Sequence, residues 1–168
     1  MPTELYLLRH AIAVPRGTPG YPGDDRPLTD DGITKMEKAA RGIVAIVAKP
    51  DLIVTSPLLR ARDTALIVAR AFDDEAIVRV SQHLLPGGKA DALWSSLELR
   101  RSPVALMLVG HEPDLGGLAS LLIGASPGSI VLKKGGLCCI EVDRFPPRGP
   151  GSLQWLLAPK HLRQLADA

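Results

Sequence analysis

The chain has 168 residues, 46% hydrophobic and 23% charged, which excludes a disordered protein and indicates one globular domain over residues 1–168. Its 20 basic and 18 acidic residues leave a net charge of +2, too small and too scattered to indicate a nucleic-acid or membrane partner. The adjacent Cys138 and Cys139 offer no disulfide framework, and charges come too early for a signal peptide, so we expect a cytoplasmic protein.

Strand and helix patterns alternate along the chain. In its first half we expect a strand at residues 5–8, an amphipathic helix at 32–47, a strand at 52–55, a helix starting at Ser56-Pro57, and a strand at 77–80. In its second half we expect a helix at 90–100, an apolar strand at 104–109, a helix at 114–122, and strands at 136–142 and 153–157. This alternation predicts an α/β fold: a single-domain three-layer sandwich with a mainly parallel central sheet and helices on both faces.

Basic side chains follow three of the predicted strands. Arg9 and His10 come after the first strand, Arg60 after the second, and His111 after the strand at 104–109. Because the carboxyl ends of parallel strands meet at one edge of a sheet, we expect these four residues to lie together. Two guanidinium groups and an imidazolium can hold the oxygens of a phosphoryl group while a neutral imidazole attacks phosphorus. The pattern therefore predicts phosphoryl transfer.

Three segments carry a resemblance to a known family. "LLRHAIA", "TSPLLRARDTA" and "VGHEPDL" resemble successive signatures of the histidine phosphatase superfamily, which includes the phosphoglycerate mutases. The chain's length, "DDRPLTDDG" and the ending "LQWLLAPKHL" are similar to the SixA-type phosphohistidine phosphatases. The resemblance implies a phosphoglycerate mutase-like fold, with His10 as nucleophile, Arg9 and Arg60 binding phosphate, and His111 stabilising the transferring group. It also implies that Arg26 adds a phosphate contact.

The segment after the third strand bears on the substrate. Larger relatives place a glutamate there as general acid, but "RVSQHLLPGGKADAL" has no carboxylate before Asp91. Since the P–N bond of phosphohistidine breaks with little help, we expect phosphohistidine on a protein as substrate, with a small phosphorylated metabolite as the alternative. Glu112 is a further candidate for substrate binding, and it and Asp91 are the fallback acids. The short segment also predicts an open pocket.

A serine hydrolase is the main competing hypothesis. Gly124 to Gly128 spell G-x-S-x-G around Ser126, and Asp143 and His161 follow in the order used by α/β hydrolases. However, Pro127 lacks the N–H that an oxyanion hole needs there, and a helix is predicted before the motif. A phosphate-binding module without catalysis is a second alternative, but all four key residues of a phosphatase are present.

We expect no metal and no other cofactor. The histidines lie in separate motifs without the spacing of metal ligands, and arginines already supply positive charge. Arg9 and Arg60 are expected to lower the pKa of His10, which keeps the nucleophile neutral, while a bound phosphate should raise the pKa of His111.

Overall fold

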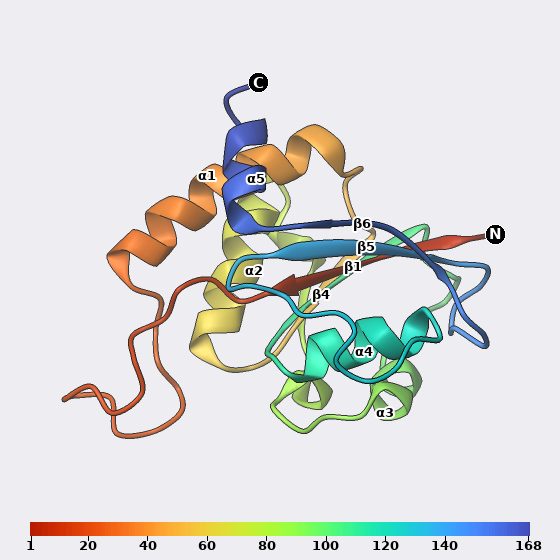
Figure 1. Cartoon of the computed structure of the whole chain (residues 1–168), viewed down its shortest axis with the longest axis horizontal. Helices are drawn as coiled ribbons and strands as arrows, with labels where there is room; N and C mark the ends of the chain where they lie inside the picture. Colours follow the sequence, from red (N-terminus) through yellow and green to blue (C-terminus); the bar gives the residue numbers. More distant parts are fainter.

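The computed structural model describes residues 1–168 and contains one six-stranded sheet in the order β3-β2-β4-β1-β5-β6 (Figure 1). Strands β1 to β4 pair in parallel, whereas β5 and β6 add to β1 as antiparallel strands. The mainly parallel sheet predicted from the alternation is confirmed. The strands are β1 (Thr3–Arg9), β2 (Leu52–Thr55), β3 (Val78–Val80), β4 (Ala105–Gly110), β5 (Leu137–Val142) and β6 (Ser152–Leu157).

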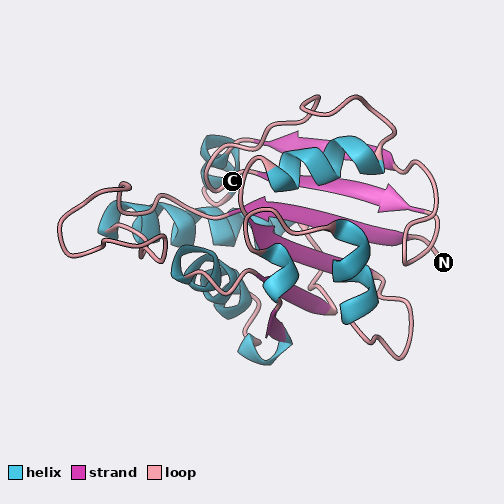
Figure 2. Cartoon of the chain, turned by 90° about the horizontal axis from the view of Figure 1, so that it is seen from below, coloured by secondary structure: helices cyan, strands magenta, loops and turns pink.

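Helices cover both faces of the sheet, which makes the fold the predicted three-layer sandwich (Figure 2). Helices α1, α2 and α5 pack on one face, and α3 and α4 pack on the other. None of them combines the length and apolar character needed to cross a lipid bilayer. The helices are α1 (Asp30–Ile46), α2 (Leu59–Ala71), α3 (Ala90–Ser96), α4 (Asp114–Leu122) and α5 (Pro159–Leu165), with 3₁₀ turns at Glu75–Ile77 and Gln82–Leu84.

The alternation of side chains along β1 explains why the core has two halves. Leu5 and Leu7 pack toward α3 and α4, while Tyr6 and Leu8 pack toward α1, α2 and α5. Strand β4 is buried along its whole length, as its continuous apolar run predicts. A sheet buried on both faces leaves its edges, and the loops that follow its strands, as the places where polar side chains can gather.

Helix α2 starts later than the sequence predicts. We expected Ser56 and Pro57 to begin it, but its N-cap is Leu58 and its first residue is Leu59. The hydroxyl group of Ser56 lies 2.8 Å from the ring of His111 and accepts the N–H of Leu58 at 3.3 Å, so it binds the residue before the helix and does not cap the helix itself. Asp25 takes over part of this role, since its carboxylate accepts the N–H of Leu59 at 2.6 Å.

Candidate active site

The carboxyl ends of β1, β4 and β2 bring the predicted residues together. Arg9 is level with Gly110 in the sheet, and Thr55 is level with Val109, so the residues that follow these strands are neighbours. The backbone N–H of His10 donates to the carbonyl of Gly110 at 3.0 Å. The rings of His10 and His111 lie 5.2 Å apart, centroid to centroid. The expected convergence on one sheet edge is therefore present.

His10 is held in a single tautomer. Its ring is 6% exposed, and Nδ1 lies 2.7 Å from the carbonyl oxygen of Ala11. A carbonyl oxygen only accepts, so Nδ1 carries the hydrogen and Nε2 keeps a free lone pair. Burial lowers the pKa of His10 to about 3, with help from the nearby charges of Arg60 and Arg9. The predicted direction is confirmed, but burial is the larger cause.

His111 is paired with Ser56. Its Nε2 lies 2.8 Å from the Ser56 hydroxyl oxygen, which also accepts the N–H of Leu58 at 3.3 Å. If the hydroxyl group donates its hydrogen to Nε2, its hydrogen and its oxygen each have a partner, and the hydrogen of the His111 ring is on Nδ1. Burial lowers the pKa of His111 to about 4, and the charge of Arg60 acts in the same direction. The ring is therefore neutral at pH 7 in the free protein.

The guanidinium groups of Arg9 and Arg60 complete a set of buried donors. Nη1 of Arg9 donates to the carbonyl of Leu132 at 2.9 Å, while Arg60 is only 3% exposed. Buried donors without a partner are costly and rare in proteins. Here all such side-chain atoms belong to predicted site residues: Arg9 Nε, Arg26 Nε, Arg60 Nε and His111 Nδ1. Such an arrangement can offer hydrogen bonds to the oxygens of an anion.

The loop before α1 adds an acidic residue that the sequence analysis missed. The carboxylate of Asp24 lies 3.0 Å from Arg16, 3.6 Å from Arg26 and 3.4 Å from Arg60. Burial acts to raise the pKa of Asp24, but the three arginines outweigh it and the pKa is below its usual value. Arg26 therefore reaches the site through a shared carboxylate. The pair of aspartates before Arg26 in "DDRP" was the available signal.

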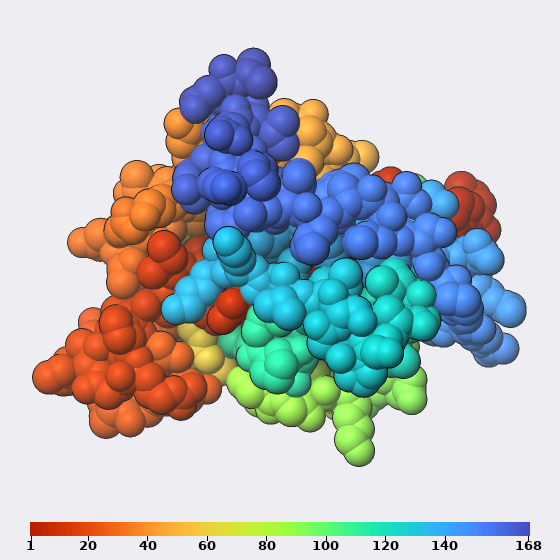
Figure 3. All heavy atoms as spheres, viewed as in Figure 1, coloured from red at the N-terminus to blue at the C-terminus, as the bar shows by residue number.

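The same loop also contacts the site. Figures 1 and 3 show it as an orange-red lobe that projects from the body of the molecule. Asp24 near its end also places its backbone carbonyl 2.5 Å from Nη1 of Arg60. His10, Arg60 and His111 are each at most 6% exposed.

Of the two fallback acids, Glu112 lies close to Arg9, since its charge acts to raise the pKa of Arg9 against the larger lowering effect of burial. Glu112 uses its carboxylate to accept the N–H of Gly116 at 2.7 Å, in the first turn of α4. Asp91 is exposed on α3. His83 is exposed and lines the same small cavity as His111. The segment after β3 thus places an imidazole, and not a carboxylate of its own, in the cavity beside His111.

The residues of the competing serine-hydrolase hypothesis are not assembled. Ser126 is exposed in a turn that follows α4, so a helix precedes the motif as predicted. Asp143 and His161 are exposed at the end of β5 and on α5, and no hydrogen bond joins any two of the three.

Comparisons with known proteins bear on the family and the fold. The model of the histidine phosphatase superfamily (branch 1) matches residues 5–84. An uncharacterized protein of Picosynechococcus is 41% identical over 164 residues, which cover 95% of this chain and 98% of that protein. A crystal structure assigned as the phosphohistidine phosphatase SixA of Agrobacterium tumefaciens is 27% identical, with a TM-score of 0.75 over 95% of this chain and 99% of that one. The protein histidine phosphatase SixA in complex with tungstate has a TM-score of 0.77 at 21% identity, over 95% and 99% of the two chains.

Proposed function

This chain belongs to the histidine phosphatase superfamily and is a phosphatase of the SixA type, and on that premise we propose that it dephosphorylates phosphohistidine on a protein, with His10 as nucleophile. One observation carries the proposal. A neutral His10, with Nδ1–H held by the Ala11 carbonyl, sits among buried donors of Arg9, Arg60 and His111 that have no partner. This is the donor set that a transferring phosphoryl group needs.

The proposed reaction has two displacements. Nε2 of His10 attacks phosphorus, the P–N bond of the substrate breaks, and the substrate imidazole leaves with its electron pair and takes up a proton. A water molecule then attacks phosphorus, the bond to Nε2 breaks, and inorganic phosphate leaves with the oxygen of that water. Arg9 and Arg60 hold the phosphoryl oxygens throughout, and Nδ1–H of His111 donates to them as charge develops.

The choice of a P–N substrate follows from how the nearby carboxylates are used. Glu112 accepts the N–H of Gly116, and Asp114, which lines the cavity beside His111, accepts the N–H of Gly87 at 2.7 Å. Asp91 does not line that cavity. An imidazole leaving group needs little protonation, whereas an alkoxide leaving group benefits strongly from an acid. A site whose nearby carboxylates already accept backbone N–H groups therefore fits phosphohistidine better than an unactivated phosphomonoester.

The test is rapid-quench trapping of the phosphoenzyme with a phosphohistidine peptide. The wild-type protein is expected to accumulate acid-labile phosphate on His10, and His10→Ala is expected to lose both the intermediate and turnover. His161→Ala, an exposed histidine outside the site, is the matched control and should behave like wild type. Labelling of His111 with full turnover in His10→Ala would overturn the assignment.

Dependence on a metal ion is tested separately. Since arginines supply the positive charge of the proposed site, turnover is expected to continue at an unchanged rate in a chelator. Activity that a chelator abolishes and a divalent ion restores would contradict the prediction.

A second candidate function is favoured by the position of His83. In this function the His83 imidazole, which lines the same cavity as His111, is the general acid for an alkoxide leaving group, which suits a small phosphomonoester. In that case His83→Gln should slow phosphomonoester turnover by a factor on the order of 10², the usual scale for losing a general acid. Under the first proposal, the same variant should leave phosphohistidine turnover unchanged.

A further inference from the structure

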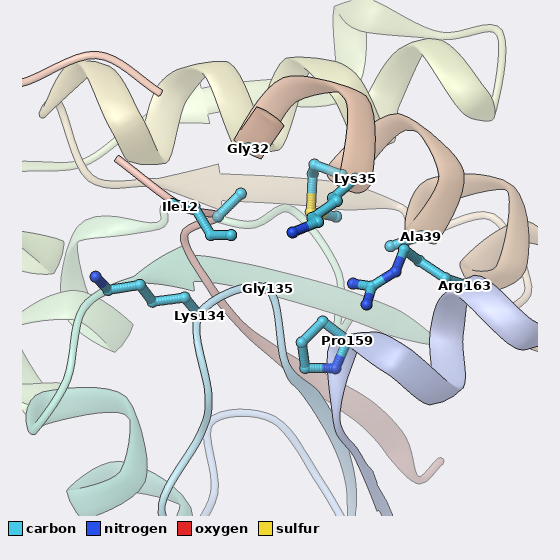
Figure 4. A pocket seen from close by; sticks show the side chains of 10 residues that line it. Ile12, Gly32, Lys35, Ala39, Lys134, Gly135, Pro159 and Arg163 are labelled. Carbon is cyan, nitrogen blue, oxygen red and sulfur yellow. The ribbon is translucent and has the colours of Figure 1, made fainter. Parts of the chain in front are cut away.

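A cavity of about 170 Å³ adjoins the residues that follow the nucleophile (Figure 4). Ala11 and Ile12, directly after His10, form one wall, and Gly135 forms another. Gly135 is tied to the nucleophile's own backbone, because its N–H donates to the carbonyl oxygen of His10 at 3.0 Å. Pro159 at the start of α5 closes the opposite side. The cavity is therefore fixed relative to the proposed reaction centre.

The charge around this cavity is entirely positive. Three basic residues line it, and no acidic residue does: Lys35 of α1, Lys134 before β5, and Arg163 of α5. Figure 4 shows the Arg163 guanidinium and the Lys35 amino group directed toward the opening, while the side chain of Lys134 extends away from it. Arg163 forms no ion pair, and Lys35 has only an exposed partner, Asp31, at 2.8 Å. Two cations thus face this space, and only Lys35 is paired with a carboxylate of this chain.

The floor of the cavity is apolar and its volume is small. Met36 and Ala39 of α1 are buried there beside Pro159. Pockets for free small molecules are commonly about 300–1,000 Å³, larger than this one. At about 30 Å³ per water-sized group, the space holds roughly five or six non-hydrogen atoms. That size and chemistry fit one side chain with an apolar stem and a carboxylate end.

We propose that this cavity, here called the flank cavity, receives one acidic side chain of the phosphorylated protein, from a residue near its phosphohistidine. The apolar stem packs on Met36 and Ala39, and the carboxylate meets Lys35 and Arg163. The inference rests on the proposed function, and it adds a specificity subsite to it. A substrate anchored here presents its phosphoryl group to His10 in a fixed register.

The test uses peptides that carry one phosphohistidine and one glutamate. The glutamate is placed in turn at each position near the phosphohistidine, and each peptide is compared with one that has glutamine at the same position. In one register, kcat/KM for the glutamate peptide is expected to exceed that of its glutamine partner by roughly three- to tenfold, the scale of one charge-assisted contact. In the double variant Lys35→Gln/Arg163→Gln this ratio should fall to about one, with free phosphohistidine turned over at the wild-type rate.

The control is Lys38→Gln/Lys160→Gln, which removes the same charge from the same two helices but does not line the cavity. Like Lys35, Lys38 has one exposed ion-pair partner, Asp167, so each double variant removes one such pair. The control should keep the glutamate preference. Two outcomes refute the subsite while the proposed function stands. In the first, wild type hydrolyses free phosphohistidine and every peptide with no preference for glutamate. In the second, both double variants lose the glutamate preference equally. If wild type hydrolyses no phosphohistidine, the proposed function fails, and the subsite with it.

Discussion

Ser56 places one hydroxyl group between the ring of His111 and the backbone N–H of Leu58. Its removal leaves Nε2 of His111 without a partner and removes the preference for a hydrogen on Nδ1. Since one hydrogen bond contributes about 0.5–1.5 kcal/mol, Ser56→Ala is expected to lower kcat by roughly two- to tenfold with little change in KM. His111→Ala, which removes the donor itself, is expected to lower kcat by a factor on the order of 10²–10³.

Steady-state kinetics with a phosphohistidine peptide checks both values. Ser95→Ala, an exposed serine on α3, is the control. An unchanged kcat in Ser56→Ala, at an unchanged melting temperature, would show that this hydroxyl group does not position the ring.

Asp24 competes with any anion for the guanidinium of Arg60. Its carboxylate lies 3.4 Å from Nη2 of Arg60 and also neutralises part of the charge of Arg16 and Arg26. The Asp24 side chain is 38% exposed, so solvent screens these pairs and each contributes modestly. Asp24→Asn is therefore expected to tighten inhibition by tungstate by roughly two- to fivefold.

The inhibition constant at fixed ionic strength is the measurement for Asp24→Asn. Asp143→Asn makes the same change at an exposed position with no ion pair and should leave the constant unaltered. Weaker tungstate binding in Asp24→Asn would show instead that the carboxylate holds the arginines in a binding geometry.

At the scale of residues, the sequence predicts the backbone positions better than the contacts. Arg9, His10 and His111 could be identified because Arg9 ends a strand and the two histidines each directly follow one. The contact between Asp24 and Arg60 spans 36 positions and depends on the path of a Pro- and Gly-rich loop, which no periodic pattern encodes. The partner of Ser56 could not be predicted either, since a serine before a proline fits a helix cap equally well.

At the scale of elements, the N-terminus of α2 depends on a residue from another segment. The carboxylate of Asp25 accepts the N–H of Leu59 at 2.6 Å, while the N-cap residue Leu58 has no side chain that can accept. Loss of a capping acceptor typically costs about 0.5–2 kcal/mol. Asp25→Ala should therefore lower the free energy of unfolding by about 1 kcal/mol and the melting temperature by roughly 2–4 °C.

Thermal unfolding followed by circular dichroism measures the effect of Asp25→Ala. Asp25→Asn keeps an oxygen acceptor and should recover most of the loss, which separates the hydrogen bond from the charge. Equal destabilisation by both variants would indicate that the negative charge at the helix N-terminus is what matters.

Element lengths explain which helices the sequence predicts. Helix α1 has 17 residues and a repeated buried face, so its periodicity is plain. Helix α5 was not predicted, because it has seven residues and buries only Leu162. Helix α3 is likewise seven residues long and ends at Ser96, earlier than the residue 100 expected from the pattern. One or two turns give too few apolar positions to mark an end.

At the scale of the whole molecule, the order of the strands brings distant segments together. Strands β1 and β4 pair although most of the chain's elements lie between them. The sequence does not encode this order in any local pattern. The location of the site could still be predicted, because the argument needed only that the strands be parallel and that their carboxyl ends share one edge.

Two neutral imidazoles buried in one fold make the stability of the whole molecule depend on pH. The pKa of His10 is about 3 and that of His111 about 4, against an ordinary value near 6.5. Below pH 6.5 the unfolded chain binds two protons that the folded protein does not, so the free energy of unfolding falls as the pH falls. The stability that depends on these two neutral imidazoles is fully present above pH 6.5. It is lost progressively as the pH falls toward 4, the pKa of His111, and then toward 3, the pKa of His10.

Urea unfolding at pH 7.0, 6.0 and 5.0 measures this loss. Each group contributes about 1.4 kcal/mol per pH unit below 6.5, so the two together should lower the free energy of unfolding by at most about 4 kcal/mol at pH 5.0. His10→Gln and His111→Gln should each remove about half of the dependence on pH, whatever they do to the stability at pH 7. His161→Gln, at an exposed position, should keep it. Carboxylates such as Asp24 titrate below this window, so a slope that persists in the double variant His10→Gln/His111→Gln would show that other groups bind the protons.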